Sequence, residues 1–406
     1  MRLAEVDLVN PENYVPGVPH DAFQVLRKEA PIFWHKEPDG GAGFWALTRY
    51  DDVMAVSKDP GTFSSYKGGT ILRDIPEDDL NNTRTIMLNM DPPQHARYRR
   101  LVSQGFTPRM TAALEPHIRE IADKIIDAVI ARGECDFVTE IAAELPLQVI
   151  AELLGIPLED RHKVFEWSNR LIGFDDPEFQ NSMEEGKLAA MEMYMYANQL
   201  ALERKGSPRD DLVSVLMNGI VEGEQLSELE FDSFFLLLAV AGNETTRNLI
   251  SGGMLALIEN HAERARLLAD PSLLPSAVEE MLRYVSPVMH FRRTATRDTE
   301  IRGQKIREGE KVTVWYISAN RDEEVFPHAN RFDAGRAPNN HLAFGIGEHF
   351  CLGSNLARLE IRIMFEQLLR RMPDIELAGP VARLRSNFIN GVKRMPVRYT
   401  RGPLAA

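Results

Sequence analysis

The sequence has little cysteine, with Cys135 and Cys351 as its two thiols in 406 residues. Two cysteines cannot form a disulfide framework, and no Cys-x-x-Cys pair is present for a structural zinc site. A long apolar run is also missing, since residues 234–241 (Phe-Phe-Leu-Leu-Leu-Ala-Val-Ala) fall far short of the roughly 18–20 residues that span a bilayer. Acidic residues stand near the N-terminus, where a signal peptide requires an apolar core. These absences predict a cytoplasmic protein in a reducing compartment.

Positive charge is scarce as well, because 47 basic residues face 60 acidic ones and the net charge is −13. Nucleic-acid binders carry basic patches, so this balance disfavours that class of protein. Hydrophobic residues at 44% and charged residues at 26% are typical of a globular protein and exclude a disordered chain. No linker-like segment and no internal repeat divides the sequence.

The hydrophobic periodicity predicts a mainly α fold with small β-sheets. Apolar residues recur at helical spacing between about 94 and 270, and helices are also expected at 145–154, 275–285 and 356–371. Residues 43–48, residues 293–316 and the end of the chain have strand-like patterns. The stretch 320–353 is rich in Asn, Pro, Gly and His and has no periodicity. An irregular stretch of this length is typically functional or disordered.

The segment Phe344-Gly-Ile-Gly-Glu-His-Phe-Cys-Leu-Gly353 places Cys351 in a glycine-framed loop before a predicted helix. Glycines permit positive φ, and the amide groups at a helix N-terminus stabilise negative charge, which predicts a thiolate. A thiolate on such a loop can ligate a metal through one bond. A free buried cysteine, or a nucleophile with His349 as its base, fits the same spacing. The residues of this loop leave all three interpretations open.

Two helical spacings elsewhere bring polar side chains together. His95 and Arg99 are four residues apart after Pro92-Pro93, so they share one helix face, which could equally be an exposed basic face. Glu280 and Arg283 are three residues apart, so they can form an ion pair across one helical turn. This pair could lie at the surface, but the apolar residues around it make burial plausible.

A third motif, Ala241-Gly-Asn-Glu-Thr-Thr246, follows the apolar run at 234–241. A buried acid is costly unless it has a partner or a purpose. From these letters alone, the simpler interpretation is that the apolar run ends there and Glu244 meets solvent.

The string Phe344-Gly-x-Gly-x-His-x-Cys351-x-Gly353 resembles the haem-binding signature of the cytochrome P450 family, and further family landmarks appear in order over about residues 85–395. The resemblance implies the cytochrome P450 fold as a single haem-thiolate domain over 1–406. It implies haem b (iron protoporphyrin IX), with Cys351 as the axial thiolate and the metal ligand. Phe344 would pack beside the sulfur, and Gly353 would let the backbone pass close to the haem.

The resemblance also implies roles for the other motifs. Propionate binding is expected of His95, Arg99, Arg293 and His349. A structural ion pair is expected of Glu280 and Arg283, with Arg331 as its third member, for folding and haem incorporation. In O2 activation, Thr245 would donate a hydrogen bond and Glu244 would relay protons.

The implied function is that of a haem-thiolate monooxygenase that activates O2 and hydroxylates a bulky hydrophobic substrate, such as a steroid, a terpenoid or a lipid. A peroxide-driven peroxygenase and a non-catalytic haem sensor or carrier are alternatives, but neither needs the relay of Glu244 and Thr245. Positional analogy predicts that the substrate pocket is lined by Ile71, Leu72, Met87, Leu237, Val240, Val288, Met289, Phe291 and Phe388.

The sequence has no G-x-G-x-x-G motif opening a βαβ unit, so it predicts no NAD or flavin site of its own. Electrons would come from a ferredoxin and its reductase, with NAD(P)H used only indirectly. The expected docking surface is a basic patch near the cysteine, with Arg100, Arg109 and Arg358 as candidates. The expected state is a monomer without a membrane anchor.

Overall fold

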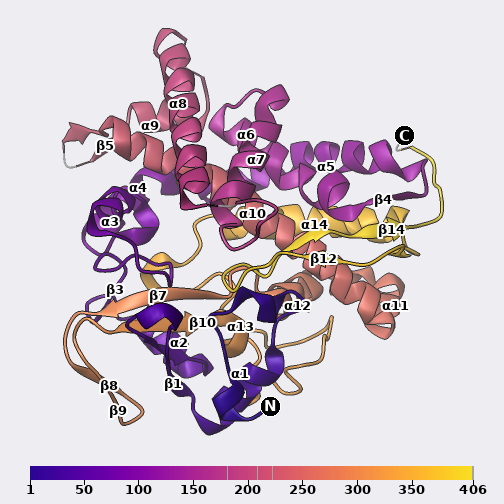
Figure 1. The fold of residues 1–406 in the computed structure, drawn as a ribbon. Coiled ribbons are helices and arrows are strands. Elements are labelled where there is room, and N and C mark those ends of the chain that lie inside the picture. The colour runs from indigo at the N-terminus through magenta and orange to yellow at the C-terminus, as the bar shows by residue number, and fades with distance from the viewer. Residues whose placement is uncertain (181, 208, 222, 405–406) are drawn as a thin grey trace.

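The computed structural model describes residues 1–180, 182–207, 209–221 and 223–404. Most helices gather on one side of the molecule and the largest sheet lies on the other, with α10 running through the middle (Figure 1). The helices are α1 (His20–Glu29), α2 (Tyr50–Ser57), α3 (Glu77–Thr83), α4 (Gln94–Ser103), α5 (Pro108–Ile130), α6 (Glu144–Leu154), α7 (Arg161–Ile172), α8 (Met183–Gly206), α9 (Leu212–Met217), α10 (Glu228–Glu259), α11 (His261–Ala269), α12 (Leu274–Val285), α13 (Tyr316–Ala319) and α14 (Ser354–Arg371).

The strands are short, and in the described part of the chain they form five sheets. They are β1 (Ile32–His35), β2 (Phe44–Leu47), β3 (Phe63–Ser64), β4 (Glu134–Asp136), β5 (Ile220–Val221), β6 (Glu224–Gln225), β7 (His290–Ala295), β8 (Thr299–Ile301), β9 (Gln304–Ile306), β10 (Lys311–Trp315), β11 (Glu376–Leu377), β12 (Ala382–Arg383), β13 (Val392–Arg394) and β14 (Pro396–Arg398). The largest sheet has the order β1-β2-β10-β7-β3. Its strand β10 runs parallel to β2 and antiparallel to β7, with Val312 opposite Arg293.

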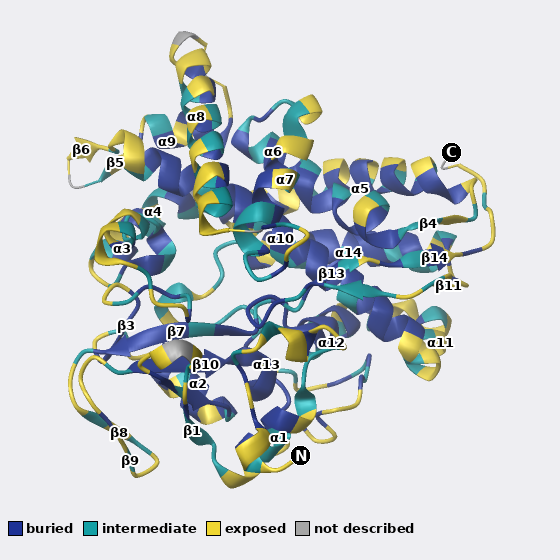
Figure 2. Ribbon diagram, in the orientation of Figure 1, coloured by how far each residue is buried: buried dark blue, intermediate teal, exposed yellow. Residues whose placement is uncertain are grey.

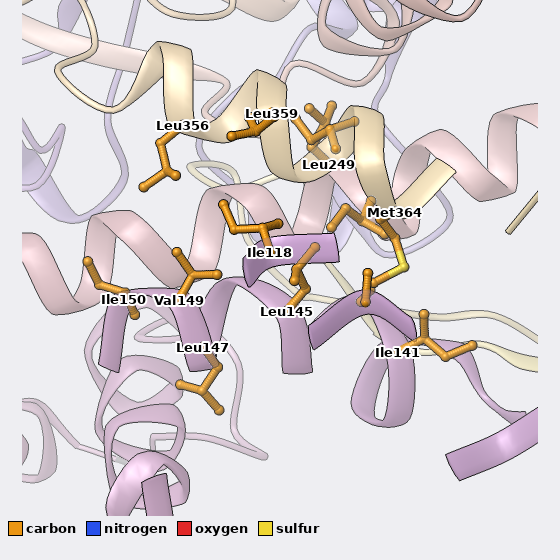
Figure 3. Packing of buried hydrophobic residues seen from close by; sticks show 14 of the residues in the cluster. Ile118, Ile141, Leu145, Leu147, Val149, Ile150, Leu249, Leu356, Leu359 and Met364 are labelled. Atoms are coloured by element: carbon orange, nitrogen blue, oxygen red, sulfur yellow. The ribbon is translucent and has the colours of Figure 1, made fainter. Parts of the chain in front are cut away.

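Helix α10 organises the helical side. It begins at a capping box, in which the side chains of Ser227 and Glu230 each accept a hydrogen bond from the other residue's backbone N–H. Its residues are largely buried around the whole circumference, as expected for a helix inside the core. It packs against α6, α7, α8, α12 and α14. Figure 3 shows the side chains of this contact, including Ile150 of α6, Leu249 of α10 and Leu356 of α14.

Burial follows the expected pattern. Helices at the surface bury the face turned to the core and expose the other, whereas β7 and β10 are buried almost throughout (Figure 2). Strand β10 is buried on both faces, since the apolar Val312, Val314 and Trp315 and the polar Lys311 and Thr313 are all buried. Among the described residues, no helix combines the length and the apolar character needed to cross a bilayer.

The prediction of a mainly α fold with small sheets is confirmed. The predicted helices at 145–154, 275–285 and 356–371 correspond to α6, α12 and α14, and Gly155 ends α6 in the left-handed conformation. The hairpin of β5 and β6, inside the predicted helical region, was missed because two-residue strands carry no detectable period. The stretch 320–353 is irregular, yet it is packed against the core through contacts such as Tyr50 Oη to the carbonyl oxygen of Asn340 at 2.7 Å.

Candidate functional site

The loop that carries Cys351 is shaped by its glycines. Gly345 and Gly347 have φ values of +67° and +80°, in the region that favours glycine. A Cβ atom on Gly347 would also overlap the backbone carbonyl of Ser57. The N–H of Cys351 donates to the carbonyl oxygen of Phe344 at 2.9 Å, which closes the turn just before α14 begins at Ser354. The loop therefore fixes the sulfur at the N-terminal end of α14.

Cys351 faces a largely apolar cavity of about 250 Å³ between the cysteine loop, α4, α10 and the start of β7. The predicted cofactor residues Phe344, His349 and Gly353 line this cavity, together with His95 and Arg99 of α4. Thr245 of α10 lines it too. The tertiary structure thus brings together segments that are more than 250 residues apart in the sequence.

The electrostatics at the sulfur differ from the prediction. Burial raises the pKa of the Cys351 thiol, while a hydrogen bond from the Gly353 backbone and the charges of Arg99 and Arg358 act in the opposite direction. The predicted amide stabilisation is therefore present but is outweighed by desolvation. A thiolate at this position needs a bound cation to offset the burial of its charge.

Basic side chains form one edge of the site. Arg99 Nη2 donates to the carbonyl oxygen of Phe350 at 2.6 Å, which ties α4 to the cysteine loop. The rings of His95 and His349 are in contact, with centroids 4.3 Å apart. His95 Nδ1 lies 3.1 Å from Glu348 Oε1, and His349 Nε2 lies 3.2 Å from Ser65 Oγ.

The charged forms of this group are destabilised. Burial lowers the pKa of His95, Arg99, His349 and Arg293, and the positive charge of Arg293 lowers the pKa of His349 further. Arg293 is buried on β7 and is not among the residues that line the cavity, although its charge reaches His349. Such a group favours an anionic ligand. An apolar cavity with one thiol and an edge of basic hydrogen-bonding side chains fits an apolar macrocycle that carries two carboxylates and a metal, so the residues fit haem.

Helix α10 contributes the motif at 241–246. Thr245 Oγ1 donates to the carbonyl oxygen of Ala241 at 3.1 Å, one turn earlier. Gly242 also lines the cavity, and a Cβ atom there would lie 2.8 Å from the side chain of Ile150. The close approach of α6 to α10 therefore explains this glycine. Helix α10 continues across Gly242.

Glu244 lies on α10 but is not among the residues that line the cavity. Its side chain is 2% exposed and pairs with Arg247, which in turn donates to Asn169 Oδ1 of α7 at 2.9 Å. Burial raises the pKa of Glu244, and the charge of Arg247 opposes this shift. Its Oε1 atom has no hydrogen-bond partner among the described residues. The interpretation that Glu244 meets solvent is therefore wrong.

The ion pair on α12 is fully buried. Arg283 Nε and Nη2 donate to Glu280 at 2.8 and 2.7 Å, and both side chains are 0% exposed. The predicted third member, Arg331, is wrong. Its side chain is exposed, and only its backbone carbonyl faces the pair and accepts from Arg283. Arg336 takes the predicted place, because its Nε donates to Glu280 Oε2 at 3.0 Å from a buried side chain.

The predicted substrate residues divide into two groups. Met87, Leu237, Val288 and Phe291 line the cavity. The other five do not, and the prediction that they line it is wrong. Val240 belongs to the main core cluster, and Leu72 and Met289 pack in a cluster around Trp315. Ile71 and Phe388 belong to a separate apolar cluster, against which Val288 and Phe291 also pack. Their apolar side chains bury surface against one another instead of facing the cavity.

Sequence reasoning missed two charged side chains, Arg336 and Glu360. Arg336 left no signal, because the stretch around it has no periodicity from which its direction could be predicted. Glu360 of α14 lines the cavity, is 2% exposed, and burial raises its pKa well above the ordinary value. An acid among Leu356, Leu359 and Ile363 on a predicted helix was a detectable irregularity.

The comparisons with known proteins agree with this geometry. The cytochrome P450 family profile matches residues 147–373. The chain is 44% identical over 402 residues to a steroid C26-monooxygenase of Rhodococcus jostii (strain RHA1), covering 97% of this chain and 84% of the relative. It is 46% identical over 389 residues to a methyl-branched lipid omega-hydroxylase of Mycobacterium tuberculosis (strain ATCC 25618 / H37Rv), covering 93% of this chain and 90% of the relative.

Solved structures show the same fold. The Mycobacterium marinum cytochrome P450 CYP268A2 in complex with pseudoionone aligns with a TM-score of 0.91 and 38% identity, over 97% of this chain and 98% of that one. CYP109E1 from Bacillus megaterium in complex with testosterone aligns with a TM-score of 0.85 and 35% identity, over 94% and 98% of the two chains. The protein described here belongs to the cytochrome P450 family, and it is a monooxygenase that uses haem and O2.

Proposed function

We propose that this protein is a haem-thiolate monooxygenase that hydroxylates a bulky hydrophobic substrate, a steroid, a terpenoid or a lipid, within one domain spanning residues 1–406. The observation that carries the proposal is that Cys351 and Thr245 line one apolar cavity with an edge of basic side chains. The relatives named for steroids and methyl-branched lipids support the substrate class. The apolar side chains of Met87, Leu237, Val288 and Phe291 are suited to such a molecule.

The proposed cofactor is haem b, with Cys351 as the iron ligand and with His95, Arg99, Arg293 and His349 as partners of the two propionates. When bound, this group supplies the iron at which O2 is reduced by two electrons, with one oxygen atom entering a C–H bond and the other leaving as water. The protein's own contribution is to orient the substrate, to exclude water from the apolar cavity and to deliver two protons.

Thr245 and Glu244 are the proposed proton-transfer residues. Thr245 Oγ1 now donates to the carbonyl oxygen of Ala241, so a rotation of its hydroxyl group directs the hydrogen bond into the cavity. Arg247 holds the Glu244 side chain away from the cavity. To deliver a proton, this side chain must leave Arg247 and turn toward Thr245.

Thr245→Ala is expected to lower the yield of hydroxylated product per NADH consumed by roughly tenfold or more, because a positioned proton donor is lost. The unused electrons are expected to appear as hydrogen peroxide. Product, NADH and peroxide are measured together, and Thr245→Ser, which keeps the hydroxyl group, serves as the control. Equal coupling in the alanine variant would show that the Thr245 hydroxyl does not serve proton transfer.

The proposed electron donor is a ferredoxin reduced by an NAD(P)H-dependent reductase, and the proposed setting is the cytoplasm, with the protein as a monomer. Arg100 and Arg109 are exposed and remain candidates for docking. Arg358 forms a bidentate ion pair with Glu279, in which its Nε and Nη2 donate to the two carboxylate oxygens at 2.7 and 2.9 Å. Its positive charge is therefore largely compensated.

The function is tested by adding ferredoxin, reductase and NADH to the purified holoprotein and by screening steroids, terpenes, fatty acids and polycyclic aromatics for a Soret shift. We expect bulky apolar compounds to bind and to be hydroxylated. Turnover that occurs with peroxide but not with ferredoxin, reductase and NADH would identify a peroxygenase. Substrate binding without any turnover would identify a sensor or carrier. Exclusive binding of small polar compounds would refute the proposed substrate class.

A further inference from the structure

A guanidinium group lies over the Phe344 ring of the cysteine loop. Arg358, near the start of α14, places its Cζ atom 4.5 Å from the centroid of this ring. Phe344 lines the cavity together with Cys351, and its carbonyl oxygen accepts from the Cys351 N–H at 2.9 Å. A cation at this distance is attracted by the face of an aromatic ring. One ring therefore connects the charge of Arg358 with the loop that carries the sulfur.

Glu279 of α12 holds the edge of the same guanidinium. Arg358 Nε and Nη2 donate to its two carboxylate oxygens at 2.7 and 2.9 Å. A bidentate pair of this kind uses the edge of the planar group and leaves its face free to stack on a ring. The two contacts of Arg358 are therefore compatible, and together they fix the orientation of the guanidinium between α12 and the cysteine loop.

A buried histidine orients Glu279 in turn. The His341 side chain is 3% exposed, and its Nε2 lies 3.0 Å from Glu279 Oε2. Its Nδ1 accepts from the Ala343 N–H at 3.2 Å, so Nε2 carries the proton and donates to the carboxylate. Burial alone would raise the pKa of Glu279, but hydrogen bonds from His341 and Arg358 outweigh it and lower that pKa to about 2. The carboxylate is therefore ionised at neutral pH.

The charges of this group reach the sulfur. Burial raises the pKa of the Cys351 thiol, and the charge of Arg358 is one of those that oppose this rise. Arg358 and Glu279 are 34% and 30% exposed, so water screens only part of their field. A positive charge near a metal favours its reduced state, and a negative charge disfavours it. The two side chains therefore act on a bound iron in opposite directions.

We propose that Arg358 is a positioning residue that holds the Phe344 ring against the cysteine loop and raises the reduction potential of the iron bound to Cys351. Glu279 fixes the guanidinium and limits the size of this effect. The inference rests on the proposed function, because it requires a metal on the sulfur. It assigns Arg358 a role at the cofactor in place of the role in docking.

The test is a spectroelectrochemical titration of the holoprotein. Arg358→Met is expected to lower the equilibrium constant for reduction by about threefold to tenfold, which is about 30–60 mV for one electron. Glu279→Gln is expected to raise this constant, because a negative charge is lost while the amide oxygen can still accept from Arg358. Arg362→Met is the matched control, since this arginine lies one turn further along α14, is 31% exposed, and pairs with Glu115 and Glu366 instead. It should leave the potential unchanged.

The opposite signs of the two shifts separate this role from a merely structural one, which would move both variants in the same direction. Shifts of equal sign, or a shift in Arg358→Met no larger than in Arg362→Met, overturn the inference when the reduced CO complex of the wild-type protein has its thiolate-type band. If Arg358→Met does not bind haem, Arg358→Lys takes its place and should stay within threefold of the wild-type constant, and a fall in Glu279→Gln overturns the inference. Loss of the thiolate-type band in the wild-type protein overturns the proposed function itself.

Discussion

Cys351→His is expected to abolish the thiolate-type Soret band of the reduced CO complex and, with it, the hydroxylation activity. In the proposed site, histidine would offer a neutral nitrogen atom where the iron-bound sulfur would carry negative charge, and this charge would set the electronic character of the iron. The other thiol of the chain, Cys135, cannot replace Cys351, because the turn from Phe344 to Cys351 places the Cys351 side chain in the cavity. The measurement is the difference spectrum of the purified variant, alongside its haem content.

Cys135→Ser is the matched control. This second thiol lies on β4, partly buried, and burial raises its pKa to about 12, so it stays protonated and away from the cavity. Its replacement should leave the spectrum unchanged. A full thiolate-type band in Cys351→His, or a colourless wild-type protein, would contradict the assignment of the sulfur as the metal ligand.

Arg283→Leu is expected to lower the free energy of unfolding by about 3–5 kcal/mol, or to prevent folding, because it leaves the Glu280 carboxylate buried with one partner fewer. Arg283 is 0% exposed, and its Nη1 also donates to the carbonyl oxygens of Asn320 and Ala329 at 2.7 and 2.8 Å. The substitution therefore removes part of the contact between α12 and the irregular stretch that leads to the cysteine loop. Urea unfolding and haem content measure the two consequences.

A comparison of Arg336→Ala with Arg331→Ala separates the two arginines of that stretch. Arg336 donates to Glu280 from a buried position, so its loss is expected to cost about 2–3 kcal/mol. Arg331 contributes only its backbone carbonyl to the pair. Its side chain is exposed, so Arg331→Ala is expected to change the free energy of unfolding by less than about 0.5 kcal/mol. Equal losses of stability in the two variants would contradict the assignment of Arg336 as the third member.

The error at Arg331 shows where prediction from sequence stops. Glu280 and Arg283 are three residues apart on one helix, so helical geometry predicts that they meet. The third member comes from a segment without periodicity, in which the spacing of two residues does not predict whether their side chains point the same way. Arg331 and Arg336 are five residues apart, and only the path of the backbone decides which guanidinium faces Glu280.

The substrate residues show the same limit. Apolar character at Ile71 and Phe388 is visible in the sequence, but an apolar side chain gains as much by packing against its neighbours as by lining a cavity. Both residues pack in a cluster of their own, which Phe388 links to Phe291. The orientation of an apolar residue is thus a property of the whole core.

By itself, the sequence determined the local features of this protein: the helices, through their apolar period; the tight cysteine loop, through its glycines; and the shared face of His95 and Arg99, through a spacing of four. The tertiary structure alone decided that Glu244 pairs with Arg247 and that Arg336 completes the ion pair on α12. The physical reason is that backbone geometry operates over a few residues, whereas burial and charge pairing depend on segments that only folding brings together.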